Sequence, residues 1–241
     1  MRSLNKFFMV AALVAISSFT FAKANLVKAF NSEDRHLSGF NAVSVAGSFD
    51  VYITQGSTES VKVDAPSDVI DRIITEVEGG VLKIYIKNNT DGMNWNFGKK
   101  KMIVYVSIKN VNAVSLAGSG DVYFKGGLRA PSLKLKLTGS GDLTGKVEVK
   151  SLETSVSGSG DITVTGRAEN SNVSVVGSGD FTGQGLATTN TSVKVAGSGD
   201  ARVNAADKID ASVVGSGDVH YTGAAKNVSS SKAGSGSVSR M

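Results

Sequence analysis

Apolar and polar residues alternate along most of this chain, and the alternation is organised around a recurring tetrapeptide, Gly-Ser-Gly-Asp. In the copy at 177–180, Val173 and Val175 stand four and two positions before the first glycine, and Phe181 follows the aspartate directly. Alternation with a period of two is typical of a half-buried strand. Each copy therefore predicts a strand, a glycine-rich corner and a second strand.

The tetrapeptide recurs at a nearly constant interval. Intact copies begin at residues 118, 139, 158, 177, 197 and 215, with a variant, Gly-Ser-Phe-Asp, at 47–50 and a worn copy, Gly-Ser-Gly-Ser, at 234–237. A unit of two short strands cannot bury its apolar face alone, so successive units must stack and share one core. The repeat predicts an all-β fold, a parallel β-helix or solenoid with rungs of about 19 residues. A β-sandwich of hairpins is the rival, but it gives no reason for the same columns to recur once per turn.

The sequence divides into a leader and one domain. Residues 1–24 have a basic start, a largely apolar run and a final Ala-Lys-Ala, which is the pattern of a cleaved signal peptide. The apolar run is shorter than a comfortable membrane span, so we expect no transmembrane span, and an uncleaved anchor is the weaker alternative. Residues 25–38 are expected to form a flexible leader. A single β-helix domain is expected over 39–238, with divergent rungs and insertions over 39–117 and regular rungs over 118–238.

The divergent part has elements of its own. Residues 66–74 carry apolar side chains at helical spacing and predict a short helix. Residues 73–78 and 81–87 predict two strands joined by a tight turn at Gly79-Gly80. The 71 residues from Gly47 to Gly118 are close to four periods, which indicates divergent rungs between those two corners.

The last copy of the repeat is polar. Ser230 and Lys232 stand where earlier copies carry apolar residues, and Ser237 replaces the aspartate. A polar terminal rung stops a solenoid from recruiting another chain, so we expect the stack to end here.

Three features together resemble a known family. They are Phe40-Asn41-Ala42-Val43 followed by 47–54, the segment Val-Glu-Gly-Gly-Val-Leu-Lys-Ile at 77–84, and the serial Gly-Ser-Gly-Asp corners. They resemble the putative auto-transporter adhesin head domain, a domain of unknown function common in exported proteins of Bacteroidetes-like bacteria. The resemblance covers roughly residues 38–225. It implies a right-handed β-helical domain in the cell envelope.

Charge and cysteine content exclude several classes of function. The chain has 26 Lys and Arg against 21 Asp and Glu, and removal of the predicted signal peptide with Arg2, Lys6 and Lys23 leaves a balance of +2. Nucleic-acid binding needs clustered positive charge, so we expect no nucleic-acid partner. The chain has no cysteine, so disulfides cannot hold it together.

The aspartate column is the sharpest chemical feature. Stacked corners would place carboxylates about 5 Å apart, which is unfavourable unless something offsets the repulsion. Each carboxylate can accept backbone hydrogen bonds within its own turn, or Ca²⁺ can bind between rungs. We favour the turn and expect no cofactor, with Ca²⁺ as the lesser alternative. The column comprises Asp50, Asp121, Asp142, Asp161, Asp180, Asp200 and Asp218.

The longest irregular segment, 88–101, holds the best partner-binding candidates outside the repeat. Trp95 and Phe97 lie beside Asn94 and Asn96, and such an aromatic and amide cluster suits a sugar or a protein partner. An equal alternative is that Trp95 and Phe97 close one end of the β-helix core.

The sequence marks no catalytic residue. Serine recurs in every corner, and only His36 and His220 could act as bases, so no unique Ser-His-Asp set stands out. We therefore predict an exported, non-enzymatic, adhesin-like or scaffolding surface that binds a cell-surface glycan or an envelope protein. The alternative is a Ca²⁺-dependent β-helix that binds or cleaves a polysaccharide. Whether the protein is periplasmic, surface-bound or secreted, and whether it forms dimers or trimers, stays open.

Overall fold

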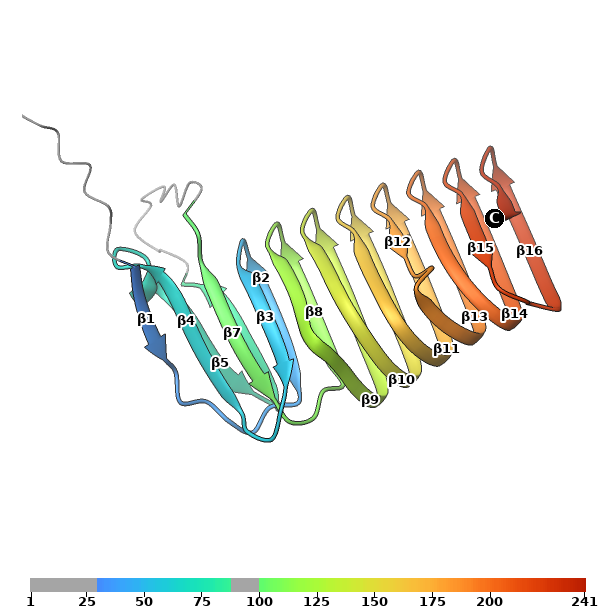
Figure 1. Cartoon of the computed structure of the whole chain (residues 1–241). Helices are drawn as coiled ribbons and strands as arrows, with labels where there is room; N and C mark the ends of the chain where they lie inside the picture. The colour runs from blue at the N-terminus through green and yellow to red at the C-terminus, as the bar shows by residue number, and fades with distance from the viewer. Residues whose placement is uncertain (1–29, 88–99) are drawn as a thin grey trace, which may run out of the picture.

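The computed structural model of this chain describes residues 30–87 and 100–241. They form a β-solenoid of about 7 turns, in which parallel coils of about 19 residues stack side by side (Figure 1). The parallel β-helix predicted from the repeat is confirmed. The rival sandwich of hairpins is wrong for the repeated part, because its neighbouring strands run in parallel.

The regular coils are built from long, bent strands. From Asp121 to Gly234, each coil begins at or just after the aspartate of one tetrapeptide and ends at the first glycine of the next, and some coils are split into two strands. The strands are β8 (Ala113–Gly118), β9 (Asp121–Gly139), β10 (Asp142–Gly158), β11 (Ile162–Gly177), β12 (Phe181–Thr182), β13 (Leu186–Gly197), β14 (Ala201–Gly215), β15 (Val219–Thr222), β16 (Asn227–Gly234) and β17 (Val238–Arg240).

The sequence columns stay in register from coil to coil. Asp142 lies opposite Asp121, and Val173 lies opposite both Thr154 and Val193. The columns two and four positions before each corner and the one directly after it point inward and are buried in every copy except the last, where Ser230 and Lys232 are exposed. One continuous apolar core therefore runs along the solenoid, as the alternation predicts.

Each coil has a tight corner and a wide corner. The tight corner is the tetrapeptide. In β10 the buried residues after it end at Val149, two outward residues follow, Lys150 and Ser151, and the inward alternation resumes at Leu152. This one-residue shift forms the wide corner, whose equivalents recur in every regular coil. The two kinds of corner lie along opposite edges of the solenoid (Figure 1).

The first tetrapeptide coil stacks directly on the coil that follows Gly118. Strand β2 (Ala42–Gly47) pairs in parallel with β8, and β3 (Asp50–Gln55) pairs in parallel with β9. The corners at Gly47 and Gly118 are therefore neighbours in the stack, and the chain between them adds its strands outside these two coils instead of between them. Residues 56–112 leave the stack and return, adding β6 (Val81–Ile86) against β2 and β7 (Ile103–Ile108) against β3 on the outer side.

Antiparallel strands complete this end of the solenoid. Strand β4 (Ser60–Pro66) pairs with β7, and β5 (Ile73–Glu78) pairs with β6 across the turn predicted at Gly79-Gly80. The helix expected over 66–74 is reduced to the 3₁₀ turn η1 (Ile70–Arg72), because Ile73 and Ile74 enter β5 and bury apolar surface there.

The segment before the domain is partly structured. Strand β1 (Phe30–Asp34), within the leader expected to be flexible, pairs antiparallel with β4, while residues 1–29 lie outside the described part. Within 30–87 and 100–241, no helix has the length and apolar character to cross a membrane.

Candidate functional site

The tight corner depends on the carbonyl of its first glycine. Gly139 has a φ of +124°, in the region that favours glycine, and this conformation turns the chain sharply after the strand. Its carbonyl oxygen accepts hydrogen bonds from the N–H groups of Ser159 and Gly160 in the next coil, at 2.9 and 3.0 Å. The same pair of bonds joins the other regular corners up to Gly217. Every corner is thus tied to its neighbour by backbone atoms.

The second glycine of the corner is required by close packing. A Cβ atom on Gly141 would overlap the carbonyl oxygen of Gly120 in the preceding coil. Phe49 can occupy the equivalent position of the first corner because no tetrapeptide precedes it in the stack, and its side chain is fully buried. The departure from the repeat at Phe49 therefore marks the place where the regular stack begins.

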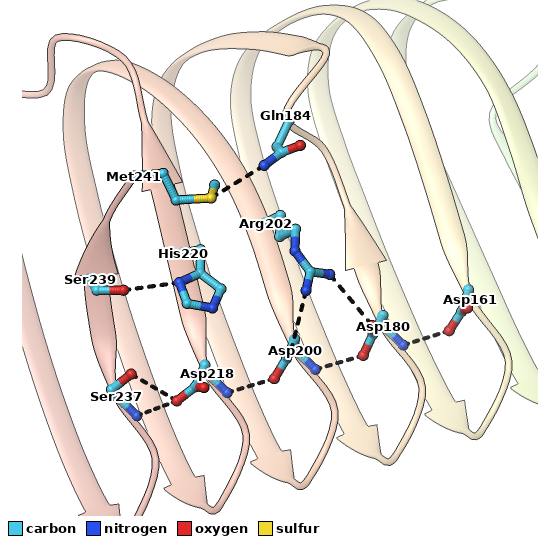
Figure 2. A network of polar contacts seen from close by, with 10 residues as sticks. All are labelled: Asp161, Asp180, Gln184, Asp200, Arg202, Asp218, His220, Ser237, Ser239 and Met241. Atoms are coloured by element: carbon cyan, nitrogen blue, oxygen red, sulfur yellow. Dashed lines mark hydrogen bonds and ion pairs between the residues drawn. The ribbon is translucent and has the colours of Figure 1, made fainter.

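The aspartate column forms a continuous hydrogen-bonded ladder, and Figure 2 shows its part from Asp161 to Ser237. The Oδ1 atom of each aspartate accepts the backbone N–H of the residue at the same position in the next coil, at 2.8 to 3.2 Å. The carboxylates that accept are those of Asp121, Asp142, Asp161, Asp180, Asp200 and Asp218. Charged acceptors form the stronger hydrogen bonds, so these contacts offset the repulsion between the stacked carboxylates.

The direction of these bonds corrects the prediction that each aspartate caps its own turn. The N–H groups of the turn itself are taken by the glycine carbonyl of the preceding coil, so the carboxylate is left to accept from the following coil. Asp50 is not part of the ladder, because the N–H of Asp121 binds the carbonyl of Phe49 instead. Across the described ranges, no three Asp, Glu or His side chains group in a way that could hold a metal ion.

Ser237 ends the ladder. Its hydroxyl and its backbone N–H both donate to Asp218 Oδ1 at 2.8 Å, and these two bonds lower the pKa of the Asp218 carboxyl. The serine therefore gives Asp218 Oδ1 two donors, whereas Oδ1 of each earlier ladder carboxylate accepts one backbone N–H.

Polar side chains flank the ladder in the C-terminal coils (Figure 2). Arg202 lies 3.5 Å from carboxylate oxygens of both Asp180 and Asp200, which partly neutralises two members of the ladder. His220 Nδ1 lies 2.9 Å from Ser239 Oγ. The carboxylate of Asp218 makes no hydrogen bond to His220 and accepts hydrogen bonds from Ser237 instead. The arrangement lacks the third member that orients the base of a nucleophilic site.

Three tyrosines stack on the outer face beside the first corners. Tyr52 of β3 lies between Tyr105 of β7 and Tyr123 of β9, with ring centroids 5.5 and 5.2 Å apart and planes inclined by 19° and 18°. Lys125 Nζ lies 4.8 Å from the Tyr52 ring centroid and 5.6 Å from that of Tyr123. We call Tyr52, Tyr105, Tyr123 and Lys125 the tyrosine stack. It presents ring edges, phenol hydroxyls and one ammonium group to solvent.

The environment of Tyr123 keeps its hydroxyl protonated. Partial burial, the nearby charge of Asp121 and a 3.2 Å hydrogen bond that its hydroxyl donates to Asp121 Oδ2 all raise the pKa of Tyr123. The tyrosine stack is therefore joined to the first member of the aspartate ladder.

Comparison with known proteins places the chain in a family. A family model described as "Putative auto-transporter adhesin, head GIN domain" matches residues 39–225. The chain belongs to this family. The matched range spans the first coil, the returning segment 56–112 and the regular coils as far as β15, so the family model covers the tyrosine stack and the tight corners of this head GIN domain.

Solved structures share the fold of this head GIN domain. A putative adhesin from Bacteroides fragilis is 25% identical with a TM-score of 0.83, and the match covers 89% of this chain and 98% of that one. A putative adhesin from Parabacteroides distasonis is 26% identical with a TM-score of 0.71, covering 89% and 98%. A putative lipid binding protein from the same species, 24% identical with a TM-score of 0.71 over 88% and 96%, shares the fold. No curated protein matches the sequence. The family and the two adhesins support an adhesin-like role and an exported or surface location.

The sequence predicts only part of the tyrosine stack in this head GIN domain. Tyr52 and Tyr123 share the column two positions after the corner aspartate, but Tyr105 has no tetrapeptide before it, so its place in the stack could not be assigned. The partner-binding candidates of the loop, Trp95, Phe97, Asn94 and Asn96, lie outside the described residues and stay a prediction.

Proposed function

We propose that this domain is a non-enzymatic binding surface of the cell envelope, which holds a glycan against the face that carries the tyrosine stack. The stack is the observation that carries the proposal, because aromatic side chains with polar tips suit a ligand that has both apolar faces and hydroxyl groups. The same outward column continues in the following coils as Thr144, Thr163 and Thr182. A glycan lying along the solenoid axis would meet one hydroxyl-bearing side chain per coil from Tyr105 to Thr182.

The geometry supports binding rather than cleavage. Glycoside hydrolysis needs two carboxyl groups in different protonation states, one of them an acid with a raised pKa. Each ladder carboxylate accepts a backbone N–H from the next coil, and the pKa of Asp218 is shifted downward. Export is part of the proposal and rests on the signal peptide predicted at 1–24 and on the adhesins of the same fold.

The test compares substitutions of two tyrosines that lie on different faces of the solenoid. The exported protein and its Tyr105→Ala and Tyr85→Ala variants are passed over a panel of immobilised neutral cell-surface glycans, and both retention and release of new chain ends are measured. Tyr105 ends the tyrosine stack, whereas Tyr85 of β6 lies on another face and donates to Glu76. We expect Tyr105→Ala to weaken retention about tenfold, equal to about 1.4 kcal/mol, and Tyr85→Ala to leave it unchanged. An equal loss of glycan retention in both variants, or the release of new glycan chain ends, would contradict the proposal. If the protein retains envelope proteins but no glycan, the partner is a protein.

A further inference from the structure

A shallow groove runs along the wide corners, on the side of the coil away from the tetrapeptides. It crosses five strands, β9, β10, β11, β13 and β14, and is lined by 126–131, Lys146, 148–150, 166–169, 187–189 and Ala206. Neighbouring parts of the groove share Arg129, Lys146 and Glu148 at one junction and Val149, Lys150 and Arg167 at the other. The groove is therefore continuous and follows the solenoid axis.

The floor of the groove is apolar. Ala130, Val149 and Ala168 lie opposite one another in β9, β10 and β11, and Pro131 stands beside them. Val149 and Ala168 are buried, so the floor lies low, and its accessible apolar surface comes from half-buried Ala130 and exposed Pro131. A ligand with apolar faces can rest on it.

The rim of the groove is positively charged. Glu148 accepts hydrogen bonds from Lys146 and from Arg129 Nε, at 3.1 and 2.8 Å, and both contacts lower the pKa of its carboxyl. Two further cations, Lys150 and Arg167, are exposed and make no side-chain hydrogen bond or ion pair with any residue of 30–87 or 100–241. Even with Glu169 at the far end, four cations stand against two carboxylates.

A row of amides and hydroxyls borders the groove. Ser151, Asn170 and Asn190 follow the wide corner at equivalent positions in three successive coils. Asn190 Nδ2 donates to Asn170 Oδ1 at 3.0 Å, which fixes both amides in a line along the axis. The remaining amide donors and acceptors face solvent and suit the hydroxyl groups of a sugar.

We propose that this groove binds a strand of carboxylate-bearing polysaccharide laid along the solenoid axis. The coils repeat about every 4.8 Å, so side chains of successive coils can contact successive groups of an extended chain. Lys150 and Arg167 lie one coil apart and pair with acidic groups, the floor contacts the ring faces, and the asparagine row binds hydroxyls. The site is separate from the tyrosine stack, so it does not rest on the function proposed above.

The test uses polygalacturonate as the probe and reverses the two unpaired cations. Binding to polygalacturonate is measured at two salt concentrations for the exported protein and for two double variants. The groove variant carries Lys150→Glu and Arg167→Glu, and the control variant carries Lys136→Glu and Lys194→Glu. The control changes the net charge equally at two exposed lysines on the face before the tight corner. We expect at least a tenfold loss in the groove variant, little change in the control and no binding of neutral dextran.

Further variants separate loss of the two cations from the effect of added acidic groups, and the groove from the tyrosine stack. Lys150→Gln with Arg167→Gln removes the cations without adding acids and should also weaken binding. Tyr105→Ala should leave polygalacturonate binding intact, which separates failure of this site from failure of the tyrosine stack. The proposal is overturned if groove and control variants lose binding equally, if the wild type does not bind the probe, or if polyphosphate binds as tightly with the same dependence on Lys150 and Arg167.

Discussion

The backbone N–H of Asp180 donates a 2.8 Å hydrogen bond to Oδ1 of Asp161, which lies one coil earlier in the stack. In turn, Asp180 Oδ1 accepts the N–H of Asp200 at 2.8 Å. A residue that both donates and accepts along the axis links three coils, so the ladder turns a row of like charges into a cohesive element. This relationship leads to predictions about stability as well as about binding.

Asp180→Ala should destabilise the domain by about 1 to 2 kcal/mol, because the N–H of Asp200 loses a charged acceptor and Arg202 loses one partner. Urea unfolding measures the loss, and exchange of the Asp200 amide hydrogen should become faster. The matched control is Asp210→Ala, an exposed aspartate whose side chain has no hydrogen-bond partner within the described ranges. Equal effects of the two substitutions would show that the ladder bonds contribute nothing.

Gly141→Ala should cost at least about 3 kcal/mol, because the added Cβ meets the carbonyl oxygen of Gly120 in the adjoining coil. Ser140→Ala, in the same corner but with an exposed side chain, should be nearly neutral. Thermal unfolding of both variants measures the difference. A Gly141→Ala variant as stable as the wild type would mean that adjacent coils can separate locally.

Phe49→Gly restores the repeated tetrapeptide and should nevertheless destabilise the domain by about 3 to 5 kcal/mol. Phe49 is fully buried at the end of the regular stack, so its removal leaves a cavity. Urea unfolding tests this expectation, with Ser48→Ala as the control from the same corner. A stabilised variant would contradict the role assigned to Phe49.

The stability of the last coil should fall at acidic pH. The folded-state pKa of Asp218 is lowered from its ordinary value of 3.8, so the stabilisation is present above that value and is lost as the pH falls through the folded-state pKa. Ser237→Ala removes one donor to Asp218 and should raise the pKa toward its ordinary value. Titration of the Asp218 carboxyl by NMR measures both. An unchanged titration in Ser237→Ala would contradict the assigned cause.

Tyr52→Ala should destabilise the domain by about 2 kcal/mol, because it removes both ring contacts of the central tyrosine. Tyr52→Phe keeps the ring and should retain most of that stability. Urea unfolding, together with the near-ultraviolet circular dichroism of the stacked rings, distinguishes the two. If Tyr52→Phe loses as much stability as Tyr52→Ala, the hydroxyl rather than the ring contributes the stability.

The regular coils could be predicted because one local rule repeats in them. Val173 and Val175 alternate with outward-facing residues before a corner that needs glycine at its first position, and both requirements act over a few residues. The position of residues 56–112 could not be predicted in this way. The spacing from Gly47 to Gly118 fits both several successive rungs and a segment that leaves and returns, and only inter-strand hydrogen bonds distinguish them.

The candidate site shows the same limit. Asp161 prefers a corner because its carboxylate accepts backbone N–H groups, yet that preference is equally satisfied by its own turn or by the next coil. Tyr105 belongs to the tyrosine stack only because β7 pairs with β3, a contact between segments more than fifty residues apart. The charged groove depends on side chains from several coils, none of which carries a recognisable motif alone.

The return of residues 56–112 to the outer side of the first coil also sets the order in which the chain can assemble. Val51 pairs with Val122, 71 residues later, whereas Leu143 pairs with Ile162 only 19 residues later. Closing the longer loop costs more entropy and lowers the folding rate. We therefore expect the regular coils, whose contacts are closer in sequence, to form before the contacts between the first coil and the coil after Gly118.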